Sequence, residues 1–329
     1  MSTPLRLSSE ALAPDEEAAA LHAEAVSNLF RDLQILLPTD TLIRRDEPLA
    51  KRTTLRVGGP ADLLVEPGSD PALALVLETA RLRGLPVTVI GRGSNLLIRD
   101  GGVRGVVVSL GHPHFSRVEI RGERITAGAG ARLKTIAHEA RRAGLTGLEF
   151  FEGIPGALGG ALRMNAGAMG AWTFDAVESL RYMSRGGVIS EAPASGIPVE
   201  YRACPLLRTH IALGAVLKAT PADAEAIRTR MDQFSRKRWD SQPSEPSAGC
   251  TFKNPLPTVP AGRLIDELGL KGTRIGDAMV SPVHANFFVN LGNATAKDVL
   301  ILIEVIRTRA REARGLELET EVEILGEDA

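Results

Sequence analysis

Two hydrophobic periodicities alternate along this chain, and together they predict a protein of mixed helices and strands. Apolar residues at helical spacing, with glycine or proline beyond the last turn, predict amphipathic helices. These predicted helices cover residues 15–36, 70–83, 133–143, 220–238, 262–268 and 296–314. Short apolar runs rich in β-branched residues predict strands between the helices. The predicted strands cover residues 61–65, 86–90, 103–110, 118–120, 124–127, 176–183, 212–219 and 286–290.

The segment 316–324 follows a third pattern, in which every second residue is glutamate. Such strict alternation predicts a half-buried strand with a row of carboxylates on its open face. All of these glutamates can be solvated, so the pattern alone singles out none of them.

Two glycine-rich segments are the candidates for chemistry. The apolar run 86–90 leads directly into 91–96 (GRGSNL), where backbone N–H groups can approach a diphosphate. Leu96 stands where a dinucleotide-binding fingerprint needs a third glycine, so an ordinary turn is the simpler interpretation of this segment alone. The segment 153–170 is too long and too rich in small residues for a turn. It predicts either backbone lying against a flat, extended ligand or a glycine-rich loop packed on itself.

Composition narrows the class of protein. The chain has 329 residues, 44% of them hydrophobic, which predicts two or three domains with sizeable cores and excludes wholesale disorder. A formal net charge of −1 argues against a nucleic-acid-binding protein. Two cysteines exclude a disulfide scaffold and a cysteine-rich zinc site, and they fit a reducing compartment. We find neither a secretory signal pattern nor a long apolar run, so we expect a cytoplasmic protein without a membrane partner.

Eight short motifs succeed one another between residues 49 and 326. They lie at residues 54–61 (TLRVGGPA), 91–97 (GRGSNLL), 153–156 (GIPG), 164–168 (MNAGA), 201–202 (YR), 247–255 (SAGCTFKNP), 261–266 (AGRLID) and 321–322 (EV). In these motifs and in their order the chain resembles the UDP-N-acetylmuramate dehydrogenases, also called UDP-N-acetylenolpyruvoylglucosamine reductases, of peptidoglycan synthesis. The short join between Tyr201 and Phe252 resembles the family's shorter type, which lacks an inserted tyrosine-bearing loop.

The resemblance implies an α+β fold with an FAD-binding domain of the vanillyl-alcohol-oxidase (PCMH) type, in two subdomains, and a C-terminal α/β substrate-binding domain. We divide the chain into a helical extension (1–45), the FAD-binding domain (46–222) and the substrate-binding domain (223–329), whose final strand returns to the active site. The resemblance further implies noncovalent FAD, NADPH as the source of electrons, and the enolpyruvyl ether of a UDP-sugar as the substrate. We expect a monomer with no metal and no nucleic-acid partner.

Both glycine-rich segments are implied to contact FAD, chiefly its diphosphate and ring. The implied cofactor-binding residues are Arg56, Gly91, Gly93, Ser94, Asn95, Leu96, Gly153, Ile154, Pro155, Gly156, Gly159, Gly160, Asn165, Ala166, Gly167 and Ala168. The residues implied for substrate binding are Asn254, Lys253, Arg238 and His284.

Three residues are implied for the chemistry itself. Arg202 lies where the family has a catalytic arginine, and a guanidinium suits a developing negative charge because it binds a carboxylate bidentately and keeps its own charge. Glu321 matches the family's glutamate before valine near the C-terminus. Cys250 stands where the family usually has serine, and its thiol, with an unperturbed pKa of about 8.5, suits proton donation to carbon. An arginine near Cys250 would lower that pKa.

The chain departs from the family pattern at three further positions. Met169 follows Ala168 where an aromatic residue is common, Glu323 stands where some members have arginine, and Cys204 replaces a common serine and is interpreted as structural. Two other functions stay open. A flavin oxidase of the same fold would share the glycine-rich segments but lack the 249–255 motif, and a covalent flavin would favour it. A non-catalytic UDP-sugar-binding regulator would purify without colour.

Overall fold

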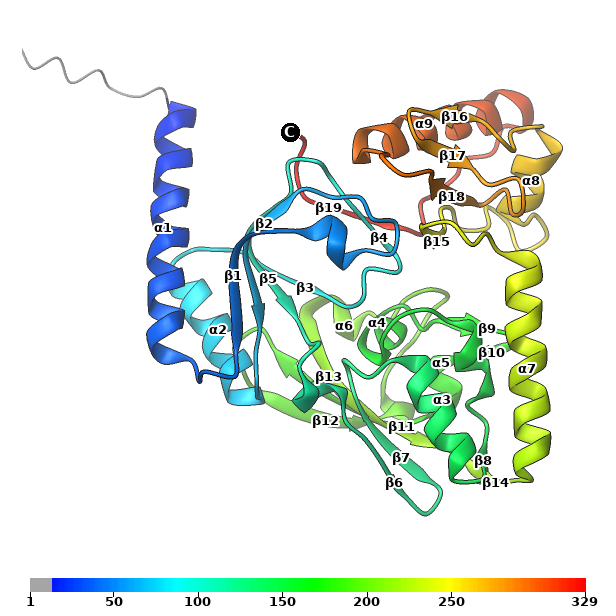
Figure 1. Cartoon of the computed structure of the whole chain (residues 1–329), viewed down its shortest axis with the longest axis horizontal. Helices are drawn as coiled ribbons and strands as arrows, with labels where there is room; N and C mark the ends of the chain where they lie inside the picture. The colour runs from blue at the N-terminus through cyan, green and yellow to red at the C-terminus, as the bar shows by residue number, and fades with distance from the viewer. Residues whose placement is uncertain (1–13) are drawn as a thin grey trace, which may run out of the picture.

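The chain folds into three parts built on separate sheets, which a computed structural model describes for residues 14–329 (Figure 1). The first 13 residues of the predicted extension 1–45 lie outside the described residues. One apolar core joins the first two parts, and a second core fills the third. No helix within the described range is long and apolar enough to cross a membrane.

The first part is a four-stranded sheet with two helices packed on it. Its strand order is β1 (Leu42–Pro48), β2 (Pro60–Glu66), β5 (Val103–Ser109) and β3 (Val87–Ile90), with β1 antiparallel and the others parallel. Residues 61–65 of β2 are buried on both faces, as expected for a covered parallel strand. α1 (Pro14–Leu36) and α2 (Asp70–Leu82) lie side by side here and confirm two predicted helices. β1 escaped prediction because its sequence, LIRRDEP, is charged, as is common on an edge strand.

The second part is a five-stranded antiparallel sheet. Its strand order is β12 (Ile189–Pro193), β11 (Val177–Ser184), β13 (His210–Lys218), β7 (Arg124–Gly128) and β6 (Val118–Arg121). β6 and β7 form the predicted hairpin around Gly122, whose φ of +60° suits glycine. The shorter elements are β8 (Leu145–Thr146), α4 (Leu158–Arg163), β9 (Gly167–Ala168), β10 (Ala171–Trp172), α5 (Thr173–Ala176), α6 (Leu206–Thr209) and β14 (Thr220–Pro221). α3 (Leu133–Arg142) buries its apolar face against this part, as predicted.

The third part is a small antiparallel sheet with two helices. Its strand order is β15 (Ser247–Cys250), β18 (Phe287–Asn290), β17 (Ala278–Val280) and β16 (Arg274–Ile275), and its helices are α8 (Ala261–Glu267) and α9 (Ala296–Arg314). Thr295 and Asp298 form a capping box at the start of α9, and Gly315 ends the helix at a φ of +63°. Both predicted helices and the predicted strand 286–290 are confirmed within one or two residues. Figure 1 shows this part, in orange and red, above the end of α7 (Ala224–Ser241).

The helix α7 begins at Ala224 rather than at Thr220 as predicted. Asp223 caps it by accepting a hydrogen bond from the Ala226 N–H, whereas Thr220 and Pro221 pair with β8. Strand pairing and a side-chain cap thus prevail over the preference of proline for a first helical turn. The break predicted at 241–246 follows α7 and leads into β15.

The prediction of one continuous strand over 316–324 is wrong. Only β19 (Glu323–Leu325) is a strand, and it pairs in parallel with β4 (Leu96–Ile98). The residues before it change partner, because the Glu321 N–H donates to the Thr251 carbonyl and the Glu323 N–H donates to the Asn95 carbonyl. A segment that moves from one partner to another forms no continuous ladder. The final strand lies next to β4, which directly follows the glycine-rich loop 91–95.

Candidate active site

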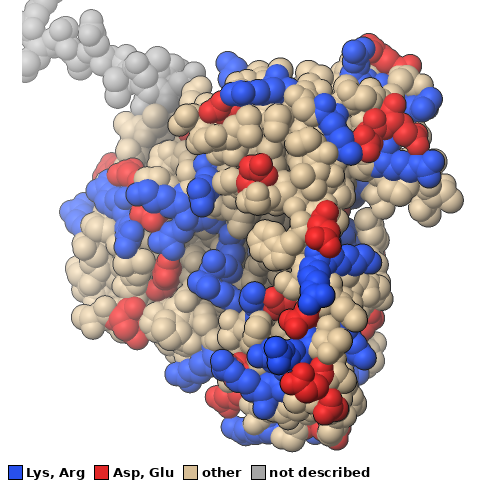
Figure 2. All heavy atoms as spheres, turned by 45° about the vertical axis from the view of Figure 1, so that its right-hand side comes forward, with Lys and Arg blue, Asp and Glu red and all other residues tan. Residues whose placement is uncertain are grey.

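The two glycine-rich segments face each other across one cavity. The loop 91–95 connects β3 to β4, and the second segment supplies residues 154–157, part of α4 and the turn after it. A cavity of about 210 Å³ lies between them and is also lined by Arg202, Cys250 and Glu321. A larger cavity of about 620 Å³ adjoins it between the two sheets and shares Arg92, Gly160 and Arg163 with it. The two cavities form one elongated groove, and Figure 2 shows basic side chains gathered around the hollow in this face.

The glycines of this groove serve two different purposes. At Gly91 and Gly160 a Cβ atom would meet no other atom within 4 Å, so these glycines leave the wall of the groove open. Gly93 has a φ of +63°, and its Cβ would lie 2.3 Å from the Arg52 carbonyl. Gly156 has a φ of +126°, and its Cβ would lie 2.9 Å from Ser94 Oγ. The first pair makes space for a ligand, and the second pair permits the turns that bring the segments together.

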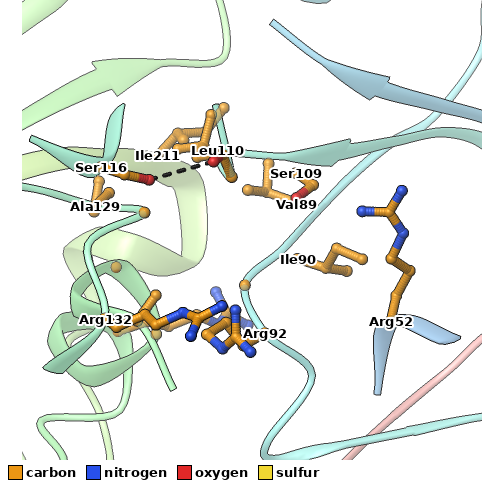
Figure 3. Close-up of a pocket in the computed structure, with 18 of the residues that line it drawn as sticks. Arg52, Val89, Ile90, Arg92, Ser109, Leu110, Ser116, Ala129, Arg132 and Ile211 are labelled. Atoms are coloured by element: carbon orange, nitrogen blue, oxygen red, sulfur yellow. Dashed lines mark hydrogen bonds between the residues drawn. The ribbon is translucent and has the colours of Figure 1, made fainter. Parts of the chain in front are cut away.

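Two arginines converge on the floor of the larger cavity. Figure 3 shows the guanidinium ends of Arg92 and Arg132 next to each other, and the ion pairs found among residues 14–329 include neither of them. Burial, followed by the charge of Arg132, lowers the pKa of Arg92 from its usual value. Two neighbouring cations without a carboxylate partner suit a diphosphate, because each guanidinium can donate two hydrogen bonds to phosphate oxygens. The shape and the charge of the groove therefore fit a flat ring joined to a diphosphate.

The ion pair of Arg202 and Glu321 closes one end of the smaller cavity. Arg202 Nε donates to Glu321 Oε1 at 2.6 Å, and the guanidinium carbon lies 5.4 Å from the centre of the Trp172 ring and 5.1 Å from that of Tyr201. The backbone of Arg202 has a φ of +59°, which is unusual outside glycine and indicates an orientation held by its surroundings. Its Nη1 atom is buried and has no hydrogen-bond partner. An anionic ligand group would satisfy that donor.

Burial and the charge of Arg202 have opposite effects on the pKa of Glu321. Burial raises the pKa of the Glu321 carboxyl above its usual value, although the charge of Arg202 and its hydrogen bond oppose the shift. The carboxyl nevertheless accepts a hydrogen bond from a guanidinium, so the ionised form is the one that the geometry serves.

Cys250 lies at the end of β15, opposite Phe287, and its thiol lines the same cavity. Burial first, and then the negative charge of Glu321, raise the pKa of the Cys250 thiol to about 12, while Arg202 lowers it only partly. Arg202 acts in the expected direction, but the thiol pKa rises overall, because desolvation of the thiolate outweighs the attraction to the guanidinium. The thiol keeps its proton throughout the neutral range.

The C-terminal segment is bound to the glycine-rich loop by its backbone. Asn95 Nδ2 donates to the Glu321 carbonyl at 3.0 Å, and the Asn95 carbonyl accepts from the Glu323 N–H at 3.0 Å. Asn95 lines the cavity, yet its side chain fixes Glu321. The loop 91–95 and the C-terminal glutamate are thus in direct contact.

Most of the sequence-predicted cofactor residues line the elongated groove. They are Gly91, Gly93, Ser94, Asn95, Leu96, Ile154, Pro155, Gly156, Gly159, Gly160, Ala166 and Gly167. Asn165 instead lines a cavity beside Trp172, and its Oδ1 accepts from the Phe174 N–H. Gly153 and Ala168 lie near each other but are absent from the groove lining, as is Arg56. All sixteen cofactor-binding assignments remain predictions, and the groove supports the twelve residues that line it.

Three of the predicted substrate residues lie in the third part, and Arg238 lies on α7. Lys253 lines a cavity of about 430 Å³ next to Arg202 and pairs with Glu319. Asn254 Oδ1 accepts from the Ala261 N–H at the start of α8.

The other two predicted substrate residues also have intramolecular partners. His284 Nδ1 accepts from the Asn286 N–H, and its ring packs against Phe287. Arg238 lies over the Trp239 ring. Asn254, His284 and Arg238 do not line the cavities described above.

Three site residues were not anticipated: Arg92, Arg132 and Arg163. Arg92 was visible inside a glycine-rich motif, but a single arginine there reads as a surface charge. Arg163 interrupts a run of small apolar residues, which was a usable signal. Arg132 had no sequence signal, because only the fold brings it to Arg92.

Comparison with known proteins agrees with this geometry. The model of an FAD binding domain matches residues 61–192, so the fold and the groove define a flavin-binding protein. The model of the UDP-N-acetylenolpyruvoylglucosamine reductase C-terminal domain matches residues 242–325. Reductases of this name are similar over most of their length. One from Rubrobacter xylanophilus is 43% identical over 90% of this chain and 98% of its own, and one from Bacillus velezensis is 43% identical over 86% and 94%.

A solved structure supports the same assignment. The UDP-N-acetylenolpyruvylglucosamine reductase (MurB) of Thermus caldophilus is 39% identical, with a TM-score of 0.74 over 87% of this chain and 99% of that chain. The chain belongs to the UDP-N-acetylenolpyruvoylglucosamine reductase family.

Proposed function

We propose that this protein is a flavoenzyme that reduces UDP-N-acetyl-3-O-(1-carboxyvinyl)-glucosamine to UDP-N-acetylmuramate with FAD and NADPH, in the synthesis of peptidoglycan precursors. The observation that carries the proposal is a single cavity in which both glycine-rich segments meet Arg202, Cys250 and Glu321. Membership of the reductase family supports the same conclusion.

The elongated groove would hold FAD noncovalently. The loop 91–95 and residues 154–156 would lie along the flavin, and Gly91 and Gly160 leave room for it. Arg92 and Arg132 would face the diphosphate. When bound, FAD carries a hydride from NADPH to the terminal vinyl carbon of the substrate.

Arg202 is suited to the charge that develops on the substrate. Hydride addition to the vinyl carbon leaves negative charge on the carboxylate-bearing carbon and its carboxylate. The buried, unpartnered Nη1 of Arg202 can donate to that carboxylate while Nε stays on Glu321. A preoriented donor at the site of developing charge stabilises the transition state more than the ground state. Glu321 would act by holding the guanidinium in this orientation.

Cys250 is suited to complete the reduction by giving a proton to that carbon. Its Sγ carries a proton because burial raises the thiol pKa to about 12. The proton would move from Sγ to the carbon that bears the ether oxygen, and solvent would then return a proton to the thiolate. Arg202, whose charge favours the thiolate, would stabilise the sulfur briefly during the transfer.

The remaining assignments complete the proposal. Lys253, next to the third cavity, would contact the UDP portion, with Asn254, Arg238 and His284 as further candidates. We keep the division into an extension (1–45), an FAD-binding domain (46–222) that holds the first two sheets, and a substrate-binding domain (223–329) that holds the third. β1 begins before the first boundary, and β19 returns from the third domain to β4. We propose a cytoplasmic monomer.

The visible spectrum of the purified protein tests this function. We expect a yellow protein that NADPH bleaches under anaerobic conditions and that the enolpyruvyl substrate turns yellow again. A colourless protein would favour the UDP-sugar-binding regulator. A flavin that stays with the denatured chain, and that oxygen but not the substrate reoxidises, would favour the oxidase.

A further inference from the structure

The glutamates of the C-terminal segment 316–325 pair with four different basic residues. The pairs are Glu317–Arg311, Glu319–Lys253, Glu321–Arg202 and Glu323–Arg163. The first two pairs stay within the third part of the chain, whereas the last two cross to the second part. The segment therefore passes from the third part to the second part between residues 319 and 321, directly before Glu321.

Arg163 is held from two sides at the end of α4. Its Nε and Nη2 atoms donate to Glu323 Oε1 at 3.2 and 2.8 Å, and its Nη1 donates to the Leu207 carbonyl at 2.8 Å. Arg163 lines the elongated groove and also the third cavity. The two side chains are 41% and 33% exposed, so this pair adds little to global stability. A local positioning role fits such a partly exposed pair better than a contribution to folding.

The chain around Glu321 shows what the pair can position. The Glu321 N–H donates to the Thr251 carbonyl at 2.8 Å, and the Glu321 carbonyl accepts from Asn95 Nδ2. Glu323 follows two residues later as the first residue of β19, and both glutamates line the smaller cavity and the third cavity. Among the described residues, two side-chain ion pairs connect residues 321–325 to the second part. They are Glu321–Arg202 and Glu323–Arg163.

We propose that the Arg163–Glu323 ion pair is a positioning device for the half-reaction in which the substrate reoxidises the flavin. It sets the C-terminal segment against α4, so that Glu321 holds Arg202 in the orientation that receives the substrate carboxylate. The proposal rests on the proposed roles of Arg202 and Glu321. Arg163 and Glu323 act through Glu321, so they are positioning residues.

Single substitutions separate this role from a role in folding. Glu323→Gln keeps the shape of the side chain but removes the charge that Arg163 pairs with. Because small misplacements of reacting groups have large effects, we expect flavin reoxidation by the enolpyruvyl substrate to slow about tenfold, with KM changing less than kcat. Reduction of the flavin by NADPH should keep its rate within about twofold, since that step does not need the substrate carboxylate site. The matched control is Glu317→Gln, which removes a pair of the same kind from the same segment and should change neither rate.

A double-mutant cycle tests the pair itself. Arg163→Gln should slow reoxidation as Glu323→Gln does, and the double variant should be no slower than either single variant. The charge-reversed variant, with Arg163→Glu and Glu323→Arg together, should recover most of the rate. The proposal would be overturned if the double variant slowed reoxidation by the product of the two single effects. It would also be overturned if Glu323→Gln slowed both half-reactions equally.

Hydrogen exchange provides a second test that needs no turnover. In the flavin-loaded protein, Glu323→Gln should speed amide exchange over residues 319–325, and Glu317→Gln should not. Unchanged exchange in Glu323→Gln would overturn the positioning role. A wild-type protein whose flavin is not reoxidised by the substrate would instead refute the proposed function, and the exchange comparison would still decide on the ion pair.

Discussion

Replacing Cys250 by serine tests whether the buried thiol gives the proton to carbon. The perturbation is small, because serine is the usual residue of the family at this position and the cavity keeps its shape. We expect Cys250→Ser to retain substantial activity, because a hydroxyl in the same place can donate a proton. Cys250→Ala should bleach normally with NADPH but lose roughly 10²–10⁴-fold in reoxidation by the substrate, which is the usual contribution of a general acid.

The structure sets the pH dependence of this step. An unperturbed thiol with a pKa of about 8.5 would be roughly three-quarters ionised at pH 9, and the proton donor would be lost. Burial and Glu321 raise the pKa of the Cys250 thiol to about 12, so only about 0.1% is ionised at the same pH. The raised pKa therefore keeps the donor protonated as the pH rises. The wild type should lose no reoxidation rate to thiol ionisation at any pH up to about 10.

Stopped-flow reoxidation against pH is the assay. The profiles of the wild type and Cys250→Ser should have the same shape up to about pH 10. A fall in the wild type near pH 8.5 that the serine variant lacks would refute the high pKa, and a normal reoxidation rate in Cys250→Ala would refute the donor. Alkylation should be slow at neutral pH because neutral thiols are poor nucleophiles, and it is best measured in a Cys204→Ala background.

Three further predictions concern the elongated groove and the Arg202–Glu321 ion pair. Gly156→Val should purify folded but largely without flavin, because the φ of +126° disfavours a side chain and a Cβ at Gly156 would lie 2.9 Å from Ser94 Oγ. The control Gly196→Ala, where a Cβ meets nothing within 4 Å, should stay yellow. Arg132→Ala should weaken FAD binding to the apoprotein about tenfold and reduce its dependence on salt, and equal affinity would exclude a diphosphate contact. Arg202→Lys should slow substrate-driven reoxidation about 10²-fold without slowing bleaching by NADPH, since lysine lacks the second donor arm.

The sequence predicted the elements that obey local rules. The buried strand β2, the capped helix α9 and the hairpin around Gly122 each have a local sequence signal that indicates the structure formed. The 316–324 segment shows the limit of such rules. Its apolar and acidic residues do alternate, but its backbone hydrogen-bond partners lie in two different parts of the chain. The backbone therefore forms a strand only where β4 lies beside it.

The site required both a resemblance and a fold. Arg202 and Glu321 are 119 residues apart, and nothing local to either indicates the other. The resemblance selected both, together with Cys250, yet it had no means of predicting the thiol pKa. That quantity depends on how deeply β15 is covered and on which of two opposite charges lies closer, and both are properties of packing.

The three proposed catalytic residues come from three different segments of the chain, and one loop bonds the segment of Glu321. Arg202 lies between β12 and β13 of the second sheet, Cys250 ends β15 of the third part, and Glu321 lies on the returning segment. Asn95, in the loop that lines the flavin groove, bonds the backbone of Glu321 through its side chain and that of Glu323 through its carbonyl. A shift of this loop would therefore move the backbone that carries the Glu321 carboxylate, which in turn accepts from Arg202 Nε. Glu321 also raises the pKa of the Cys250 thiol. The position of the loop would therefore affect both the orientation of the Arg202 guanidinium and the protonation of Cys250.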